Sequence, residues 1–310
     1  MIIHETTVEA GQTTSLKLPI GSLPSGESVS MELKIARAHQ EGPVVLITAG
    51  VHGDEINGVD ILRRLILNGV LDRIKCGSLI LIPVVNVYGF INRTREVPDG
   101  KDVNRSFPGN MTGSLASRIA RVLTKKILPT VDLVIDLHTG GQGHYNYPQI
   151  RYTKGDANSE ILGKVFNPPI LIGKSAISKS FRRIASDANK PFLLFEGGEN
   201  LRLDELSIQE GMNGILRLLA HLELIDDPGF LKNPIHHFEQ TSWIRASRSG
   251  IFRLYSHSGQ EVKKGSVIGE IGDPKGTKSF DVLAVRDSMI IGHNKMAVVN
   301  QGDALFHTAY

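Results

Sequence analysis

Short apolar runs alternate along this chain with segments whose apolar residues recur at helical spacing. The runs are rich in Val, Ile and Leu and lie at residues 44–49, 79–85, 133–137, 170–172 and 192–195. Runs that are apolar at every position indicate strands buried on both faces, as in a parallel sheet. The helical segments between and after them lie near residues 56–68, 115–128, 180–188 and 208–222. The alternation predicts an α/β fold with a doubly wound, mainly parallel sheet.

The two ends of the chain have a different texture. Residues 1–40 are polar and turn-rich, apart from an alternating segment at 29–36 that predicts a half-buried strand. After about residue 240, short apolar runs alternate with turn residues and no helical period is present. We therefore expect an α/β domain over residues 1–240, with residues 1–40 as an N-terminal β extension, and a small all-β domain over 241–310. The segment 225–234 is the expected linker.

Charge and cysteine content exclude several classes of protein. Among the 310 residues, the formal net charge is +3 and basic and acidic residues are interspersed, so no nucleic-acid partner is expected. The single cysteine, Cys76, excludes an internal disulfide and a thiolate-rich metal site. No stretch of about 18 consecutive apolar residues is present, so no membrane contact is expected. A cytoplasmic protein is the expectation, and self-association into a homo-oligomer is left open.

Three candidate metal ligands follow apolar strands. His52 and Glu55 come directly after the run at 44–49, and His138 ends the run at 133–137. Each alone is weak evidence, because surface His and Glu pairs are common and a lone His after a strand is often a core residue. Together they point to one site, because ligands of open α/β sheets bind outside the carboxyl ends of the strands. Two His and one carboxylate are typical of a catalytic zinc site, in which a fourth position is left for water.

Two further features suit hydrolytic chemistry. Glu196 ends the apolar run at 192–195 and would project toward the same edge as a general base, although Glu199 or Glu205 also lie nearby. The long polar segment 92–109 carries three arginines and Asn104. Arginine binds carboxylates with two parallel hydrogen bonds and stabilises a developing oxyanion. An ordinary charged surface loop is the alternative interpretation of this segment.

Together these motifs resemble the succinylglutamate desuccinylase/aspartoacylase family, a branch of the zinc carboxypeptidase superfamily. The resemblance covers about residues 40–310. It rests on four motifs: His-Gly-Asp-Glu at 52–55, Asp-Val-Asn-Arg-Ser-Phe-Pro-Gly at 102–109, Asp-Leu-His-Thr at 136–139 and Phe-Glu-Gly at 195–197.

The resemblance implies a role for each motif. His52, Glu55 and His138 match the ligands of one Zn²⁺ per chain, and Glu196 matches the general base. Arg95 matches the arginine that polarises the scissile carbonyl, and Asn104 with Arg105 matches the pair that grips a substrate carboxylate. The implied fold is a carboxypeptidase-like α/β domain with a smaller β domain that helps to cover the mouth of the active site.

The run from His138 to Pro148 is closer to the broad "predicted deacylase" branch, which includes N-acetyl-diaminobutyrate deacetylases of ectoine breakdown. In this run and just after it, Tyr145, Tyr147 and Arg151 are expected to line the acyl or side-chain pocket, with packing under the loop as the alternative. The β domain resembles a lipoyl/biotinyl-like barrel sandwich. Its segment 273–278 lacks the lysine motif of a carrier, so we expect no covalent carrier function.

These observations favour a zinc-dependent deacylase that cleaves the amide of a small N-acyl amino acid. A metallocarboxypeptidase acting on peptides and a non-catalytic metal-containing binding protein on the same scaffold are the alternatives. Five further histidines have no partner that the sequence indicates and are expected to be structural or solvent-exposed; they are His236, His237, His257, His293 and His307.

Overall fold

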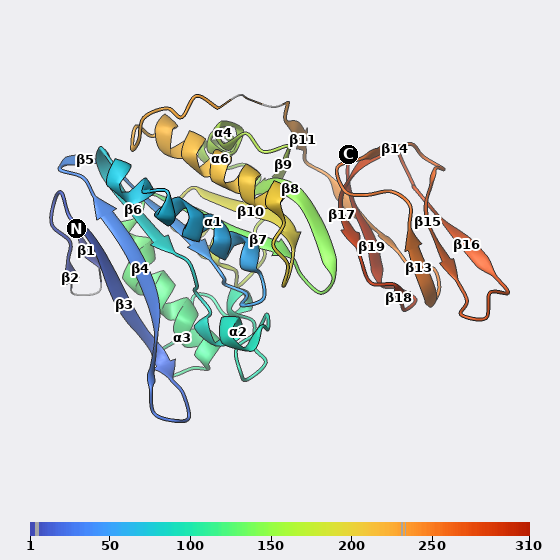
Figure 1. Cartoon of the computed structure of the whole chain (residues 1–310), viewed down its shortest axis with the longest axis horizontal. Helices are drawn as coiled ribbons and strands as arrows, with labels where there is room; N and C mark the ends of the chain where they lie inside the picture. Colours follow the sequence, from blue (N-terminus) through green and yellow to red (C-terminus); the bar gives the residue numbers. More distant parts are fainter. Residues whose placement is uncertain (4–5, 231, 233) are drawn as a thin grey trace.

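A large mixed sheet runs through the molecule (Figure 1). The computed structural model describes residues 1–3, 6–230, 232 and 234–310. The order along the main path of the sheet is β3-β4-β6-β5-β7-β10-β8-β17-β19-β12, with β9 and β11 beside β8 and β14 beside β17. The α/β class with a mainly parallel central part is confirmed.

The central four strands are parallel and buried. They are β6 (Cys76–Ile82), β5 (Gln40–Ala49), β7 (Leu133–Gly140) and β10 (Phe192–Glu199). Every residue of β6 and β7 is buried. Apolar side chains can occupy both faces because helices cover both sides of the sheet.

Helices form a layer on each face. On one face, α1 (Ile56–Leu67), α4 (Ala157–Phe166) and α6 (Glu205–His221) share a core with the sheet. On the other face lie α3 (Leu115–Val122) and α5 (Phe181–Asp187), together with the hairpin strands. The short α2 (Val87–Asn92) follows β6, and a π-helical turn, Leu123–Ile127, extends α3.

The connections place a topological switch point between β5 and β7. The chain leaves β5 through α1 to reach β6, and returns from β6 through α3 to β7 on the opposite face. At this point the loops that follow neighbouring strands lead to opposite faces of the sheet and leave a crevice between them. Open α/β sheets bind their ligands in this crevice.

The N-terminal segment forms more sheet than its sequence indicates. The strands β3 (Thr13–Ser22) and β4 (Ser28–Arg37) form an antiparallel hairpin that joins β6, and β4 covers the expected strand at 29–36. The small pair β1 (Ile2–Ile3) and β2 (Thr6–Thr7) precedes them. The many polar residues of β3 favour turns when the sequence is considered alone. In the structure they are exposed on one face of a strand, and alternate residues of its second half are buried.

The central sheet continues into the C-terminal region through β8 (His144–Tyr152). There β17 (Ser288–Asn294), β19 (Ala304–Ala309) and β12 (Thr241–Arg245) extend it with antiparallel pairing. A second antiparallel sheet holds β13 (Gly250–Leu254), β15 (Val267–Gly272), β16 (Ser279–Leu283) and β18 (Val298–Val299). The two sheets enclose a core of their own that includes Ile244, Phe252, Ile271, Leu305 and Phe306.

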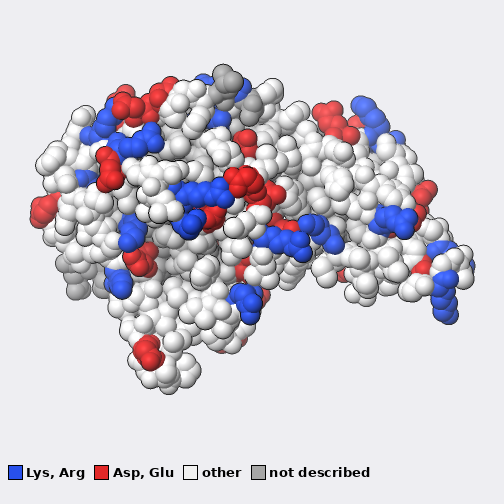
Figure 2. All heavy atoms as spheres, viewed as in Figure 1, with Lys and Arg blue, Asp and Glu red and all other residues white. Residues whose placement is uncertain are grey.

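Three short strands complete the structure: β9 (Ile170–Gly173), β11 (His236–Phe238) and β14 (Glu261–Val262). Of the expected linker, Leu231 and Asn233 lie outside the described residues. No helix among the described residues is both long and apolar enough to cross a membrane. On the face shown in Figure 2, basic and acidic side chains are interspersed.

Close packing of α1 against the sheet generates a stability prediction. A Cβ atom at Gly58 would lie 2.6 Å from the Cβ of Leu137 on β7. Gly58→Ala is expected to lower the free energy of unfolding by about 1–3 kcal/mol through overpacking, although Gly→Ala in an exposed helix stabilises by about 1 kcal/mol. Urea unfolding measures the difference.

The matched control is Arg63→Ala on the outer side of the same helix, where the side chain is 63% exposed. Its unfolding free energy is expected to stay within about 0.5 kcal/mol of the parent. A Gly58→Ala protein more stable than the parent would contradict the close helix–sheet contact.

Candidate metal centre and its pocket

His52, Glu55 and His138 meet at the switch point. His52 lies in the loop that leaves β5, Glu55 caps the start of α1, and His138 lies within β7. Glu55 Oε1 is 2.7 Å from His52 Nδ1, and Glu55 Oε2 is 2.9 Å from His138 Nδ1. The two Nδ1 atoms are 3.2 Å apart. All three side chains are buried. His138, which is 86 residues from His52 and 83 from Glu55 in the sequence, thus forms one compact cluster with them.

The cluster fits a divalent metal ion. One ligand atom from each residue lies within 4.8 Å of the others. Donors of a tetrahedral zinc site lie about 2.0–2.2 Å from the ion and so about 3.3 Å from one another, close to the separations found here. Two imidazole nitrogens and a carboxylate form the donor set typical of catalytic zinc, because a fourth position then faces the pocket.

Outer carboxylates orient both imidazole rings. Asp136 Oδ2 lies 2.8 Å from His138 Nε2, and its Oδ1 accepts a hydrogen bond of 2.6 Å from Thr48 Oγ1. Asp102 Oδ1 lies 3.3 Å from His52 Nε2. Each Nε2–H therefore faces a carboxylate, and each Nδ1 is turned toward Glu55. Such partners fix the tautomer and raise the basicity of metal-ligating histidines.

The electrostatic environment favours positive charge at this point. Burial lowers the pKa of His138, but the charges of Asp136 and Glu55 outweigh it, so this pKa lies well above its ordinary value. The pKa of His52 is also raised, because Glu55 and Asp102 outweigh its burial. Conversely, burial raises the pKa of Glu55, yet the two imidazoles hold it well below the usual range. A site that stabilises cationic charge between its donors meets the electrostatic requirement of a metal ion.

Arg95 lies at the edge of the cluster. Its Nε and Nη2 donate to Asp102 Oδ2 at 3.2 and 2.9 Å, and its Nη1 donates to Glu55 Oε1 at 3.1 Å. Burial lowers the pKa of Arg95, but Glu55 and Asp102 raise it above its ordinary value. Arg95 is therefore a fixed, permanently charged donor, as stabilisation of an oxyanion requires.

Glu196 lies on the strand beside His138. The two residues are paired in register in the parallel strands β10 and β7, so their side chains emerge on the same face of the sheet. Neighbouring strands lie about 4.8 Å apart. Glu196 Oε2 accepts a 2.9 Å hydrogen bond from Asn146 Nδ2, and Oε1 lies 3.2 Å from Arg151 Nη1. Each oxygen has one donor and keeps a lone pair.

Asn104 and Arg105 lie beside the start of α5. Asn104 Oδ1 accepts from the backbone N–H of Phe181 at 2.9 Å, which leaves its Nδ2 hydrogens free to donate. Arg105 is exposed, and its Nη1 donates to the carbonyl oxygen of Asn104 at 2.7 Å. Both residues line a cavity of about 740 Å³. The same cavity contains Glu196 and the side chains of His52, Glu55 and His138, which are called the metal cluster below.

Three further cations line the same cavity. Lys174, at the end of β9, donates to Thr241 Oγ1, and Arg245 of β12 donates to the carbonyl oxygen of Gly302. Arg182 is only 6% exposed; its Nη2 donates to the carbonyl oxygen of Ser175, and its Nη1 has no hydrogen-bond partner among the described residues. Burial and the charge of Arg151 lower the pKa of Arg182 to about 10, and burial also lowers that of Lys174.

These cations are paired with neutral oxygens, and a buried guanidinium nitrogen is left unpaired. A buried charge is unfavourable unless a counter-charge and hydrogen bonds compensate it. The pocket is therefore suited to a ligand that carries negative charge near Arg182 and Lys174 as well as near Asn104 and Arg105.

The structure separates two expected pocket residues from this cavity. Arg151 lines it, but Tyr145 and Tyr147 line a different cavity, on the other face of β8. Successive residues of a strand point to opposite faces, so His144 and Asn146 face the metal cluster and the two tyrosines face away. A register irregularity between Asn146 and Gln149 brings Arg151 to the same cavity as Asn146. The expectation that Tyr145 and Tyr147 line the acyl or side-chain pocket therefore differs from the structure.

Some residues of the site were not assigned a role from sequence. Asp136 lies two positions before His138, and period-two alternation of a strand places both on one face, which is a usable signal. Asn146, Arg182 and Trp243 come from segments without such a signal. They reach the cavity only through the pairing of β8 with β10 and β17 and through the packing of α5 and β12.

A family model places this site among known proteins. The succinylglutamate desuccinylase/aspartoacylase catalytic domain matches residues 41–222, which contain every residue of the metal cluster and Glu196. The chain belongs to the succinylglutamate desuccinylase/aspartoacylase family. The resemblance inferred from the four sequence motifs is thereby confirmed.

Whole-chain relatives agree with this membership. The chain is 29% identical to the N-alpha-acetyl-L-2,4-diaminobutyric acid deacetylase of Halomonas elongata, over 94% of this chain and 89% of the relative. A succinylglutamate desuccinylase/aspartoacylase from Rhodobacter sphaeroides superposes with a TM-score of 0.85 at 26% identity, covering 96% of each chain. The product-bound ectoine utilization protein EutE (DoeB) from Ruegeria pomeroyi shares the fold, with a TM-score of 0.87 at 23% identity over 98% and 97% of the two chains.

The Asp136–His138 contact generates a prediction about metal affinity. Asp136→Asn removes the negative charge that orients His138, and we expect divalent-metal affinity to fall about 10–100-fold. Competition with a chromophoric chelator measures the affinity directly, without any substrate.

Asp132→Asn is the matched control, because Asp132 precedes the same strand and accepts a hydrogen bond from the backbone N–H of Val44 at an exposed position. Its metal affinity is expected to equal that of the parent. Equal affinities in all three proteins would show that Asp136 does not support the cluster.

Proposed function

We propose that this chain is a zinc-dependent deacylase that hydrolyses the amide bond of a small N-acyl amino acid. The buried His52, Glu55 and His138 cluster, with the carboxylate of Glu196 in register beside it, is the observation that carries the proposal. Family membership supports it, as does the deacetylase activity in the name of the Halomonas elongata relative. Zinc, one ion per chain, lowers the pKa of water and polarises a carbonyl oxygen when it is bound at such a site.

Glu196 acts as general base and then as general acid. A free lone pair on its carboxylate accepts a proton from the attacking water as the water oxygen bonds to the amide carbon. The carboxyl group then gives this proton to the leaving nitrogen as the C–N bond breaks, so the products are a carboxylic acid and an amine. Asn146 and Arg151 hold the two oxygens and so fix the orientation of the group.

Arg95 stabilises the negative charge that develops on the amide oxygen. Its guanidinium is held by Asp102 through two nitrogens, so little reorganisation is required as the charge forms. Its Nη1 donates to Glu55 Oε1, so the guanidinium lies directly beside the metal cluster.

Asn104 and Arg105 bind the carboxylate of the amino acid. The free Nδ2 of Asn104 and the guanidinium of Arg105 are suitable donors, and they position the amide before reaction. In the same cavity, Arg182, whose Nη1 has no hydrogen-bond partner among the described residues, and the ammonium of Lys174 favour a second acidic group on the substrate. We therefore propose an acidic N-acyl amino acid as substrate class.

A panel of substrates tests the proposal. Amine release from N-acetyl-aspartate, N-acetyl-glutamate, N-succinyl-glutamate and N-alpha-acetyl-2,4-diaminobutyrate is measured with and without a chelator, beside metal analysis. We expect about one zinc per chain, loss of activity with the chelator, and kcat/KM at least about tenfold higher for the acidic members, because a charged hydrogen bond contributes about 1.5–3 kcal/mol.

Variants at neighbouring arginines locate the selectivity. Arg182→Gln should raise KM for the acidic substrates. It should also lower the ratio of their kcat/KM to the kcat/KM of N-alpha-acetyl-2,4-diaminobutyrate. Arg183→Gln is the control, because Arg183 is exposed and paired with Asp187. A preference for the diaminobutyrate compound would overturn the acidic class, and cleavage of peptides alone would favour a metallocarboxypeptidase. Bound zinc without turnover on the panel or on peptides would favour a binding protein.

Removal of the general base tests the mechanism. Glu196→Gln is expected to lower kcat about 10²–10⁴-fold, the usual contribution of a positioned acid or base, with zinc content unchanged. Glu199→Gln on the same strand is the matched control, because Glu199 pairs with Lys295 outside the cavity. A Glu196→Gln enzyme with near-parental kcat would refute the assignment.

A further inference from the structure

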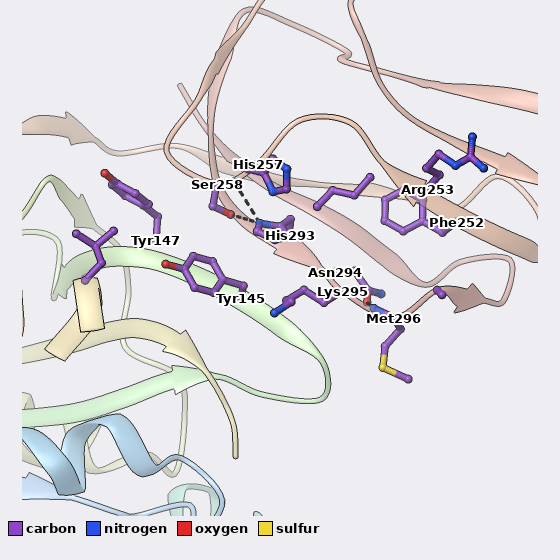
Figure 3. A pocket seen from close by; sticks show the side chains of 13 residues that line it. Tyr145, Tyr147, Phe252, Arg253, His257, Ser258, His293, Asn294, Lys295 and Met296 are labelled. Carbon is purple, nitrogen blue, oxygen red and sulfur yellow. Dashed lines mark hydrogen bonds between the residues drawn. The ribbon is translucent and has the colours of Figure 1, made fainter. Parts of the chain in front are cut away.

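A second cavity lies on the opposite face of β8 from the metal cluster (Figure 3). It has a volume of about 660 Å³, within the usual range of small-molecule sites. Its walls come from β8, the first turn of α6 and strands of the C-terminal region, so it lies where the catalytic layer meets that region. Residues of the proposed mechanism do not line it.

The body of this cavity is apolar and aromatic. Tyr145 and Tyr147 form one wall, and the ring of Tyr145 packs against that of His293 at a centroid distance of 5.3 Å. Leu206 and Met296 face the space and remain 45% and 54% exposed. Large apolar side chains gathered in one concave place favour a ligand with an apolar body.

His293 supplies a polar group at the base of the cavity. Its side chain is 95% buried, with only 5% exposed. Its Nδ1 accepts from the backbone N–H of Ser258 at 3.1 Å and from Ser258 Oγ at 2.7 Å, as Figure 3 shows. Because Nδ1 accepts, the hydrogen of the neutral ring is on Nε2, and Nε2 has no partner among the described residues. The ring therefore presents an N–H donor that no described residue accepts from.

His293 is a neutral hydrogen-bond donor at neutral pH. Burial, together with the neighbouring His257 and Lys295, lowers the pKa of His293 to about 4. The acidic groups nearby are already engaged. Glu199 pairs with Lys295, Glu270 pairs with Arg253, and Asp204 accepts from the Tyr145 hydroxyl at 3.4 Å.

We propose that this cavity binds a small carboxylic acid with an aromatic ring. The ring lies against Tyr145, Tyr147 and Leu206, and a carboxylate oxygen accepts the hydrogen bond from His293 Nε2. An aromatic ring matches the flat tyrosine walls, and a carboxylate oxygen matches the neutral N–H donor that His293 supplies at the base of the cavity. The ligand would contact the strand that also carries Asn146 toward Glu196.

Three probes that share one ring test the class of ligand. Phenylacetate, 2-phenylethanol and 2-phenylethylamine differ in charge, and their binding to the full-length, metal-loaded protein is measured by isothermal titration calorimetry and saturation-transfer NMR. We expect phenylacetate to bind at least about tenfold more tightly than the alcohol, the amount that a charge-assisted hydrogen bond contributes. The amine is expected to bind most weakly.

Cavity-filling variants locate the bound probe. Leu206→Trp places an indole in the cavity and should weaken phenylacetate binding at least about tenfold. Leu203→Trp is the matched control, because Leu203 is 57% exposed in the same segment and does not line the cavity. Deacylase turnover is expected to be unchanged in both. His293→Phe should reduce phenylacetate to the affinity of the alcohol, and Leu206→Trp keeps the test valid if that variant does not fold.

Three results would overturn the proposal. Binding of none of the probes would exclude the ligand class. Phenylacetate binding that survives Leu206→Trp but is lost in Arg182→Gln would place the acid in the catalytic cavity. Equal affinity for the three probes would show that the cavity recognises the ring alone. These outcomes are independent of whether the chain hydrolyses N-acyl amino acids.

Discussion

The structure depends on the burial of one carboxylate, Glu55, between two imidazoles at the switch point of the sheet. Burying these groups is unfavourable unless opposite charge and hydrogen bonds compensate the loss of water. The compensation is local: Asp136 and Asp102 face the outer nitrogens of the rings, Arg95 faces Glu55, and the backbone N–H of Thr139 donates to Glu55 Oε2 at 3.0 Å. These contacts hold the donor atoms of His52, Glu55 and His138 in place and favour positive charge between them, as the binding of a cation requires.

One strand, β8, connects the parts of the molecule that act on this site. It pairs with β10, which carries Glu196, and with β17, which belongs to the C-terminal region. Its even-numbered residues His144 and Asn146 face the metal cluster, while Tyr145 and Tyr147 face the second cavity. Because β17, β19 and β12 extend the central sheet through β8, Trp243 and Arg245 of β12 line the cavity that contains His52, Glu55 and His138. The C-terminal β region is thus structurally continuous with the layer that holds the metal cluster.

Much of the central fold was predictable because its signals are local. Runs that are apolar at every position read as buried strands, and helical spacing marked α1, α3, α5 and α6. The sequence does not indicate the strand β8, because residues 140–143 and Pro148 favour turns and the polar residues of the strand conceal its alternation. The helix α4 was missed although Asp156 caps it by accepting from the N–H of Ser159 at 3.1 Å. In both cases tertiary pairing and packing outweigh a weak local preference.

The sequence by itself determined which residues reach the metal centre, because parallel strands bring their carboxyl ends to one edge and His52, Glu55, His138 and Glu196 each follow or end such a strand. Only the tertiary structure decided what surrounds them. The direction of a side chain on β8 depends on its pairing register with β10 and β17, which a one-residue shift would reverse. Likewise, Arg182 enters the catalytic cavity only because α5 packs against β10, a contact between residues whose spacing carries no periodic signal.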